Sequence, residues 1–315
     1  MEPIRAAEGI LDFLRNCPRL EVAFLSCTIQ TFTDSEELVS LPLLRSFTHE
    51  SPYGGYELCL LDRLSLPSTC RVVLVVDVTK HGRDPWVPDL PTPRDASHLS
   101  NIRTIKIAAL PRNPDIRGGP IVFKFELRSP ARGVVSFDRT SNHSQKPTDF
   151  SHTGLLDTLE RIEVGSVETL CFQNCPAFKT KQLQATAEPN ITQALQRFWN
   201  LKTLILAESA TILPLDDPNL SSCRTVDTLV ILDMFLYDEL LSRVQRFAES
   251  RKKAGFPLKV LTLVLPFAEP YPSELEQLMG CVGWVEVVTG RDASEWDIDK
   301  YLLGAAAQRD NANGT

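Results

Sequence analysis

Few residues in this sequence have the types and spacing that metal binding or catalysis would need. Cys171 and Cys175 are separated by three residues, which is the closest approach to half of a zinc site, but no second half follows at a usable spacing. Asp216 and Asp217 form an acidic pair before a proline, as is typical of a solvated turn. We therefore expect Cys171 in a strand and Cys175 in a loop, with no metal and no cofactor bound.

The known catalytic motifs are missing from the sequence. It has no G-x-S-x-G elbow, no H-E-x-x-H helix, no Walker loop and no dinucleotide glycine fingerprint. Four of the five histidines, at 81, 98, 143 and 152, fall in expected loops, and the fifth is His49. Gly118-Gly119-Pro120 indicates a turn into a hairpin and not a phosphate cradle. These observations predict a protein that is not an enzyme.

The composition is that of an ordinary folded protein. Of 315 residues, 43% are hydrophobic and 23% charged, which is enough apolar material for a long core. A formal net charge of −7 argues against nucleic acid as the partner. No stretch approaches the ~18 apolar residues of a membrane span, and no apolar signal core follows Met1. With eight scattered cysteines read as small core residues, we expect a cytoplasmic or nuclear location.

One six-residue pattern recurs along the chain: apolar, charged, any residue, apolar, any residue, apolar. All eight copies carry a charge at the second position, while His49 and Gly290 break the last apolar position of two of them. The copies are residues 20–25, 44–49, 102–107, 167–172, 201–206, 226–231, 258–263 and 285–290.

The spacing of the copies predicts a repeat protein. The last five begin at 167, 201, 226, 258 and 285, giving steps of 34, 25, 32 and 27 residues. Leucine-rich repeats have periods of about 20–29 residues and the same L-x-x-L-x-L core. The intervening segments carry apolar residues at helical spacing, as in Leu240, Val244 and Phe247, and Ser273 with Glu276 forms a capping box. We expect an α/β, irregular leucine-rich-repeat-like (ribonuclease-inhibitor-like) solenoid with a mostly parallel sheet and helices on the outer side.

Side-chain alternation then predicts a binding face. The fourth and sixth residues of each hexapeptide should point into the core, and the third and fifth should face out along a concave sheet surface. Trp86, in a proline-rich loop, is a second expected contact. The predicted partner-binding positions of the concave face are Thr104, Lys106, Thr169, Cys171, Thr203, Ile205, Thr228 and Val230.

The middle of the chain is less regular. Residues 71–78 are a continuous apolar run, which predicts a fully buried strand, and 121–127 can pair with 133–137 as a hairpin. We expect a single solenoid over 1–307, with irregular insertions near 79–100 and 108–150 and a disordered tail at 308–315.

Four segments carry a resemblance to a known family: 16–21 (NCPRLE), 41–47 (LPLLRSF), 61–67 (LDRLSLP) and 202–206 (KTLIL). With them the chain resembles the large fungal family of F-box-like proteins with degenerate leucine-rich repeats, over nearly its whole length. In that family an F-box docks onto the adaptor of a cullin-type ubiquitin ligase and the repeats hold the substrate. Because the first helix–strand unit starts almost at once, we expect only the repeat region here, with an F-box supplied upstream if at all.

The sequence therefore predicts a non-enzymatic protein-recognition module, and the resemblance implies the substrate-binding part of an F-box-type ubiquitin-ligase subunit. Two alternatives stay open. One is a structural scaffold unrelated to ubiquitin, and the other is an α/β hydrolase-like enzyme, which would need a deep pocket at the strand ends.

Overall fold

The computed structural model describes residues 3–27, 38–51, 60–61, 63–77, 102–111, 121–129, 133–141, 164–173, 197–207, 224–232, 238–265, 272–289 and 298. The chain forms two compact units, Met1–Val164 (unit 1) and Gly165–Thr315 (unit 2). Both are built mainly of parallel strands with few helices, so the chain is α/β as expected. The single array over 1–307 stays a prediction.

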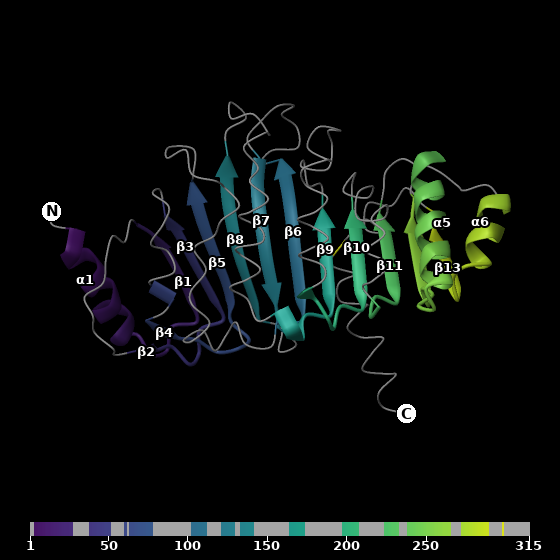
Figure 1. Ribbon diagram of the computed structural model, residues 1–315. Coiled ribbons are helices and arrows are strands. Elements are labelled where there is room, and N and C mark those ends of the chain that lie inside the picture. Colours follow the sequence, from purple (N-terminus) through teal and green to yellow (C-terminus); the bar gives the residue numbers. More distant parts are fainter. Residues whose placement is uncertain are drawn as a thin grey trace. The chain divides into compact units, whose positions relative to one another are not determined.

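The described residues of unit 1 include the helix α1 and the strands of a larger and a smaller sheet (Figure 1). In the larger sheet the strand order is β1-β3-β5-β8-β7-β6, and all neighbours are parallel except β7, which runs antiparallel to both β8 and β6. Strands β2 and β4 form a separate parallel pair. The elements are α1 (Pro3–Arg15), β1 (Val22–Ser26), β2 (Val39–Ser40), β3 (Ser46–Ser51), β4 (Leu64–Ser65), β5 (Arg71–Asp77), β6 (Thr104–Pro111), β7 (Ile121–Arg128) and β8 (Val134–Ser141), and Val164–Ser166 form the 3-10 helix η4.

The hairpin predicted at 121–127 and 133–137 is confirmed as the antiparallel pair β7 and β8. The sheet order is not the chain order, however, because β8 and not β6 lies beside β5. The approach of β8 depends on Gly133, where a Cβ atom would lie 2.0 Å from the carbonyl oxygen of Ser68. The expected hexapeptide copy at 102–107 leads into β6, which runs antiparallel to its neighbour β7.

Unit 2 has strands in simple succession, β9-β10-β11-β12-β13, all parallel. Helices predicted from the apolar spacing precede the last two strands, as the sequence indicates. The helix α5 ends at Lys253, and two residues later the φ of Gly255 is 85°, a left-handed conformation that glycine adopts without strain. The elements are β9 (Thr169–Gln173), β10 (Thr203–Ala207), β11 (Thr228–Leu232), α5 (Asp238–Lys253), β12 (Val260–Val264), α6 (Pro272–Met279) and β13 (Trp284–Val288).

A buried arginine attaches α5 to the sheet of unit 2. Arg251 is completely buried, its guanidinium donates a hydrogen bond to the backbone carbonyl of Val226, and it lies 5.6 Å from the centre of the Phe247 ring. Lys252 extends to the carbonyl of Gly280 at 2.7 Å. Two basic residues at the carboxyl end of this helix, where positive charge is favoured by the helix dipole, thus also make specific contacts with the rest of unit 2.

The hexapeptides align in register across the strands. Third residues lie opposite one another, as Val22 does with Ser46, and Thr203 does with both Thr169 and Thr228. The first, fourth and sixth positions are mostly buried, which confirms the predicted inward side.

Two strands depart from the predicted pattern. The last copy is displaced by three residues. Val260, the third residue of the hexapeptide 258–263, lies opposite Trp284 and not opposite Val287. The copy therefore reads Val282–Val287, with Gly283 at its second position. The run 71–78 is also not fully buried: within β5, Val72 and Leu74 are buried, and their neighbours are partly exposed. In β5, therefore, only the side chains on one face of the strand are fully buried.

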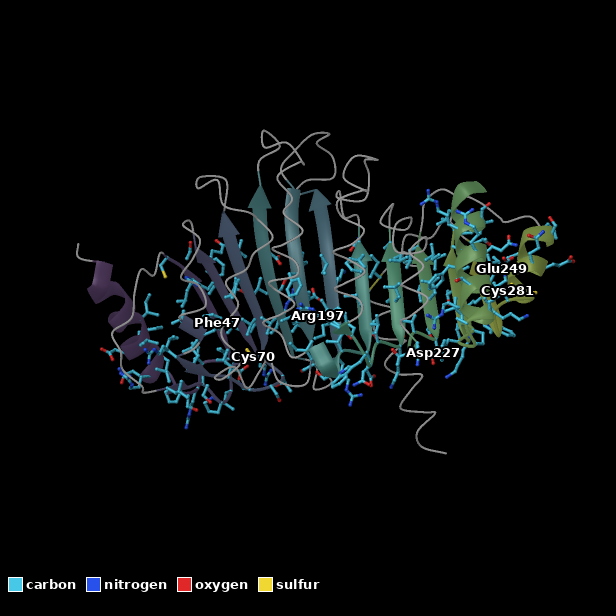
Figure 2. All side chains as sticks on the ribbon, viewed as in Figure 1. Phe47, Cys70, Arg197, Asp227, Glu249 and Cys281 are labelled. Carbon is cyan, nitrogen blue, oxygen red and sulfur yellow. The ribbon has the colours of Figure 1, made fainter. Side chains whose placement is uncertain are left out.

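The charge at the second position of the hexapeptide has a structural explanation. Second residues of neighbouring strands carry opposite signs and pair at the amino ends of the strands, where Asp227 is seen in Figure 2. All three pairs are partly exposed, so each stabilises the fold by about 1 kcal/mol at most. The pairs are Glu21 with Arg45 at 3.6 Å, Glu168 with Lys202 at 3.1 Å and Asp227 with Lys259 at 2.9 Å.

Candidate protein-binding face

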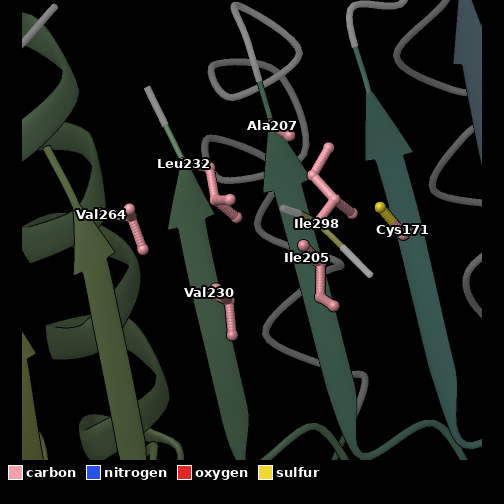
Figure 3. Packing of buried hydrophobic residues seen from close by; sticks show 7 residues of the cluster. All are labelled: Cys171, Ile205, Ala207, Val230, Leu232, Val264 and Ile298. Carbon is pink, nitrogen blue, oxygen red and sulfur yellow. The ribbon is translucent and has the colours of Figure 1, made fainter. Parts of the chain in front are cut away.

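The predicted concave face is not accessible in unit 2. Thr203 is 1% exposed and Ile205 0% exposed, and Thr169, Cys171 and Val230 are buried too, so the expected exposure of these positions is wrong. Of the predicted positions in unit 2, Thr228 alone is partly exposed. On this face Ile298 packs in a buried apolar cluster with side chains of the strands (Figure 3): Cys171, Ile205, Ala207, Val230, Leu232 and Val264.

In unit 1 the equivalent face carries polar side chains on β6, β7 and β8. Thr104 and Lys106, the two predicted positions that fall here, are both half-buried on β6. In register, Lys106 lies opposite Glu126 of β7, and Glu126 lies opposite Ser136 of β8. Because side chains alternate between the two faces of a sheet, the polar residues of three adjacent strands are brought onto one side.

We call this surface the charged face. Several of its side chains contact one another. The Lys124 ammonium lies 3.8 Å from the Asp138 carboxylate, and the Ser136 hydroxyl donates a hydrogen bond to Asp138 at 2.5 Å. Arg128 forms an ion pair with Glu126. The charged face consists of Arg71, Thr104, Lys106, Lys124, Glu126, Arg128, Ser136 and Asp138. Four of these side chains are basic and two are acidic, and Glu50 of β3 lies on the same side of the sheet, opposite Val75 of β5.

The electrostatics of the face are those of a partly dehydrated surface. Burial raises the pKa of the Asp138 carboxyl above its usual value, and the nearby Glu126 carboxylate adds to the rise. The Ser136 hydroxyl, Lys124 and Arg71 act in the opposite direction. A charge held at the edge of the solvent in this way interacts more strongly with an incoming charged group than a fully hydrated one does.

Six residues of the charged face were missed by the sequence analysis: Arg71, Lys124, Glu126, Arg128, Ser136 and Asp138. The signal that could have found them is the period of two in IVFKFELR (121–128), where Phe125 and Leu127 alternate with the charges. The hairpin was recognised, but its outward residues were not followed across the three strands.

Cys27 and His49 form the one thiol–imidazole contact between described residues, and it is structural. The sulfur lies 3.9 Å from Nε2 of His49, which also lies 3.1 Å from the Cys27 carbonyl oxygen. Burial raises the pKa of the Cys27 thiol, which keeps it protonated and a poor nucleophile. His49 is fully buried, so it fills the sixth, inward position of its hexapeptide in place of an apolar residue.

The other chemical candidates find no support in the described part of the chain. Cys171 lies in β9 as predicted, whereas Cys175, Trp86, the Asp216-Asp217 pair and Gly118-Gly119 fall outside the described residues. Among the described residues there is no group of three or more His, Cys, Asp or Glu side chains that could hold a metal ion. Within the same residues, no helix has the length and apolar character to cross a membrane.

No protein-family model matches this sequence, and no curated protein matches it either.

Proposed function

We propose that this chain is a non-enzymatic protein-recognition module, a leucine-rich-repeat-like solenoid with its helices on the outer side, which binds a protein partner through the charged face of unit 1. The observation that carries the proposal is the contrast between the outward faces of the two units. In unit 2 that face is apolar and buried, whereas over β5 to β8 of unit 1 it carries charged side chains, of which Arg71 is exposed and Lys106 half-buried.

The parallel stacking supports the repeat interpretation. Copies of the hexapeptide in β1 and β3, and in β9 through β12, pair in parallel with their third residues opposite one another. Stacked units of this kind present a broad sheet surface instead of a closed pocket, and such surfaces commonly bind other macromolecules. The copy in β6 is the exception, because it belongs to an antiparallel meander.

The chemistry of the face favours an acidic partner surface. Arg71 is exposed on β5, and Lys106 is half-buried on β6. An acidic segment of a partner that approached this side of the sheet would be attracted by the cations of Arg71 and Lys106.

The test exchanges the sign of the charges at these two positions. The double variant Arg71→Glu, Lys106→Glu should lose partner capture by about tenfold or more, because like charges then meet across the interface. The matched control is Arg246→Glu, Lys253→Glu, which makes the same change in net charge at exposed positions of α5. Capture is measured by quantitative affinity purification from fungal cell extract, with thermal unfolding of each variant recorded alongside.

The outcomes separate the hypotheses. Proteins retained by the wild type and the α5 control, but lost with the charged-face variant, would support recognition through this face. Equal capture by both variants would refute it. The ubiquitin-ligase role remains a prediction from the resemblance, and it requires cullin-ligase subunits among the proteins captured by a chain carrying an F-box upstream. Their absence would leave the scaffold alternative.

A further inference from the structure

Large apolar side chains are exposed on the first and last strands of the chain. Val22 is 64% and Phe24 61% exposed on β1, and Trp284 is 66% exposed on β13. Among the described residues, β1 pairs only with β3, and β13 only with β12. Exposed apolar residues on an edge strand are a usual starting point for association through the sheet.

The same backbone hydrogen bond joins four pairs of neighbouring parallel strands. In each pair the N–H of the third hexapeptide residue donates to the carbonyl of the second hexapeptide residue of the preceding strand, whereas between β12 and β13 the Gly283 N–H donates to the Leu258 carbonyl at 3.0 Å. In the four pairs the bond is 3.2 Å from Ser46 to Glu21, 3.0 Å from Thr203 to Glu168, 3.0 Å from Thr228 to Lys202 and 3.1 Å from Val260 to Asp227. Every link therefore has a donor side and an acceptor side, and these two sides are different.

The groups that form this bond are present at both edges of the described strands. Val22, the third residue of the first hexapeptide, has an N–H with no described preceding strand to donate to. Gly283, the second residue of the displaced last hexapeptide, has a carbonyl with no described following strand to accept from. The β1–β3 pairing uses the carbonyls of Glu21 and Glu50. Because the backbone groups of successive residues in a strand point to alternate sides, the groups of Val22 and Phe24 point to the free side of β1.

We propose that the β1 edge of one copy of this chain binds the β13 edge of a second copy, so that the parallel sheet continues from chain to chain. Val22 N–H would donate to the Gly283 carbonyl, and Val22 would stand opposite Trp284. A head-to-tail contact of this kind leaves one edge of each type unused, and further copies add to it in the same direction.

The side chains of the two edges fit this pairing. Val22 and Trp284 occupy the same third-position row, since each lies opposite a third residue of its neighbour, Ser46 and Val260. They would therefore meet on one face and cover each other's apolar surface. In the next row Phe24 would lie beside Glu286, whose carboxylate accepts a hydrogen bond from Thr262 on β12 at 3.2 Å and so turns away from the edge.

Two single variants test the proposal by complementation. Val22→Pro removes the donor N–H, a change that an edge strand tolerates on its free side, and Trp284→Glu removes the aromatic surface. Each should weaken association about tenfold or more. Mixed in equal amounts they should associate again, because the first still has an intact β13 edge and the second an intact β1 edge. Met279→Glu, at an exposed position of α6, is the control and should behave as the wild type.

The measurement is the weight-average mass by sedimentation over a wide range of protein concentration, with circular dichroism to confirm that each variant is folded. The expected results are masses above 35.2 kDa for the wild type, that mass for each variant alone, and twice that mass for the mixture. A wild type that stays monomeric at every concentration overturns the proposal. So does a mixture that stays monomeric, or a Trp284→Glu variant that still self-associates, which would indicate a symmetric β1–β1 contact.

Discussion

Replacing Thr203 with glutamate is the sharpest test of how the sheet of unit 2 is covered. This residue sits at a third position, lies opposite Thr169 and Thr228 in the two neighbouring strands, and is 1% exposed. If the third positions formed an open binding face, as the sequence predicts, a charge would be tolerated there. In the structure the same substitution places a carboxylate in the interior.

The magnitude follows from the burial of an unpaired charge. An uncompensated charge in a protein interior costs about 3–5 kcal/mol, against a total stability of about 5–15 kcal/mol for a typical domain. The introduced carboxyl would also have its pKa raised in the folded state by dehydration. Since the folded pKa then exceeds the unfolded value of about 4.3, the penalty is complete above the folded pKa and disappears as the pH falls towards the unfolded one.

The assay is urea unfolding of the full chain followed by circular dichroism at neutral and at mildly acidic pH. The matched control is Thr104→Glu, a third position in unit 1 that is half-buried and lies opposite Arg128, where the cost should stay below about 1 kcal/mol. If both variants were equally stable at neutral pH, the outward face of unit 2 would not be buried, and the account of Figure 3 would be wrong.

Three further predictions concern unit 1. Gly133→Ala should lower the free energy of unfolding by at least about 2 kcal/mol, because the added Cβ would clash with the backbone. Gly9→Ala, in a helix with open space around the residue, should raise the free energy of unfolding by about 0.5–1 kcal/mol. Urea titration measures both changes. Asp138 has a raised folded pKa, so acidification through that pKa should stabilise the wild type, and this gain should be absent from Asp138→Asn over the same pH series. Burial raises the pKa of Cys70 to about 11, so its thiol should resist alkylation at pH 8 in the folded chain and react once urea unfolds it, as peptide mapping would detect.

The inward half of the fold could be read from the sequence because one rule governs it. Residues such as Leu204 and Leu229 recur at fixed positions of the hexapeptide, and an apolar residue at such a position has only the core to enter. The helices α5 and α6 were predictable for the same reason, with caps and apolar spacing in agreement. The order of β6 and β8 was not, because nothing local distinguishes which of two strands running in the same direction lies beside β5.

The outward half could not be read from position alone, and the composition of each strand explains why. Strands β9, β10 and β11 read TLCFQ, TLILA and TLVIL, which are nearly continuous apolar runs, and parallel strands with that composition are buried on both faces. The strands of the meander alternate, as in IVFKFELR, and a strand that alternates keeps one face for the solvent or for a partner. The same hexapeptide therefore has opposite consequences in the two units. Its fifth residue is Cys171 or Ile205, clustered with Ile298, in unit 2, and Lys106 opposite Glu126 in unit 1. Apolar and polar residues alternate in the strands of the β6–β8 meander, and for that reason the proposed partner surface is placed on them.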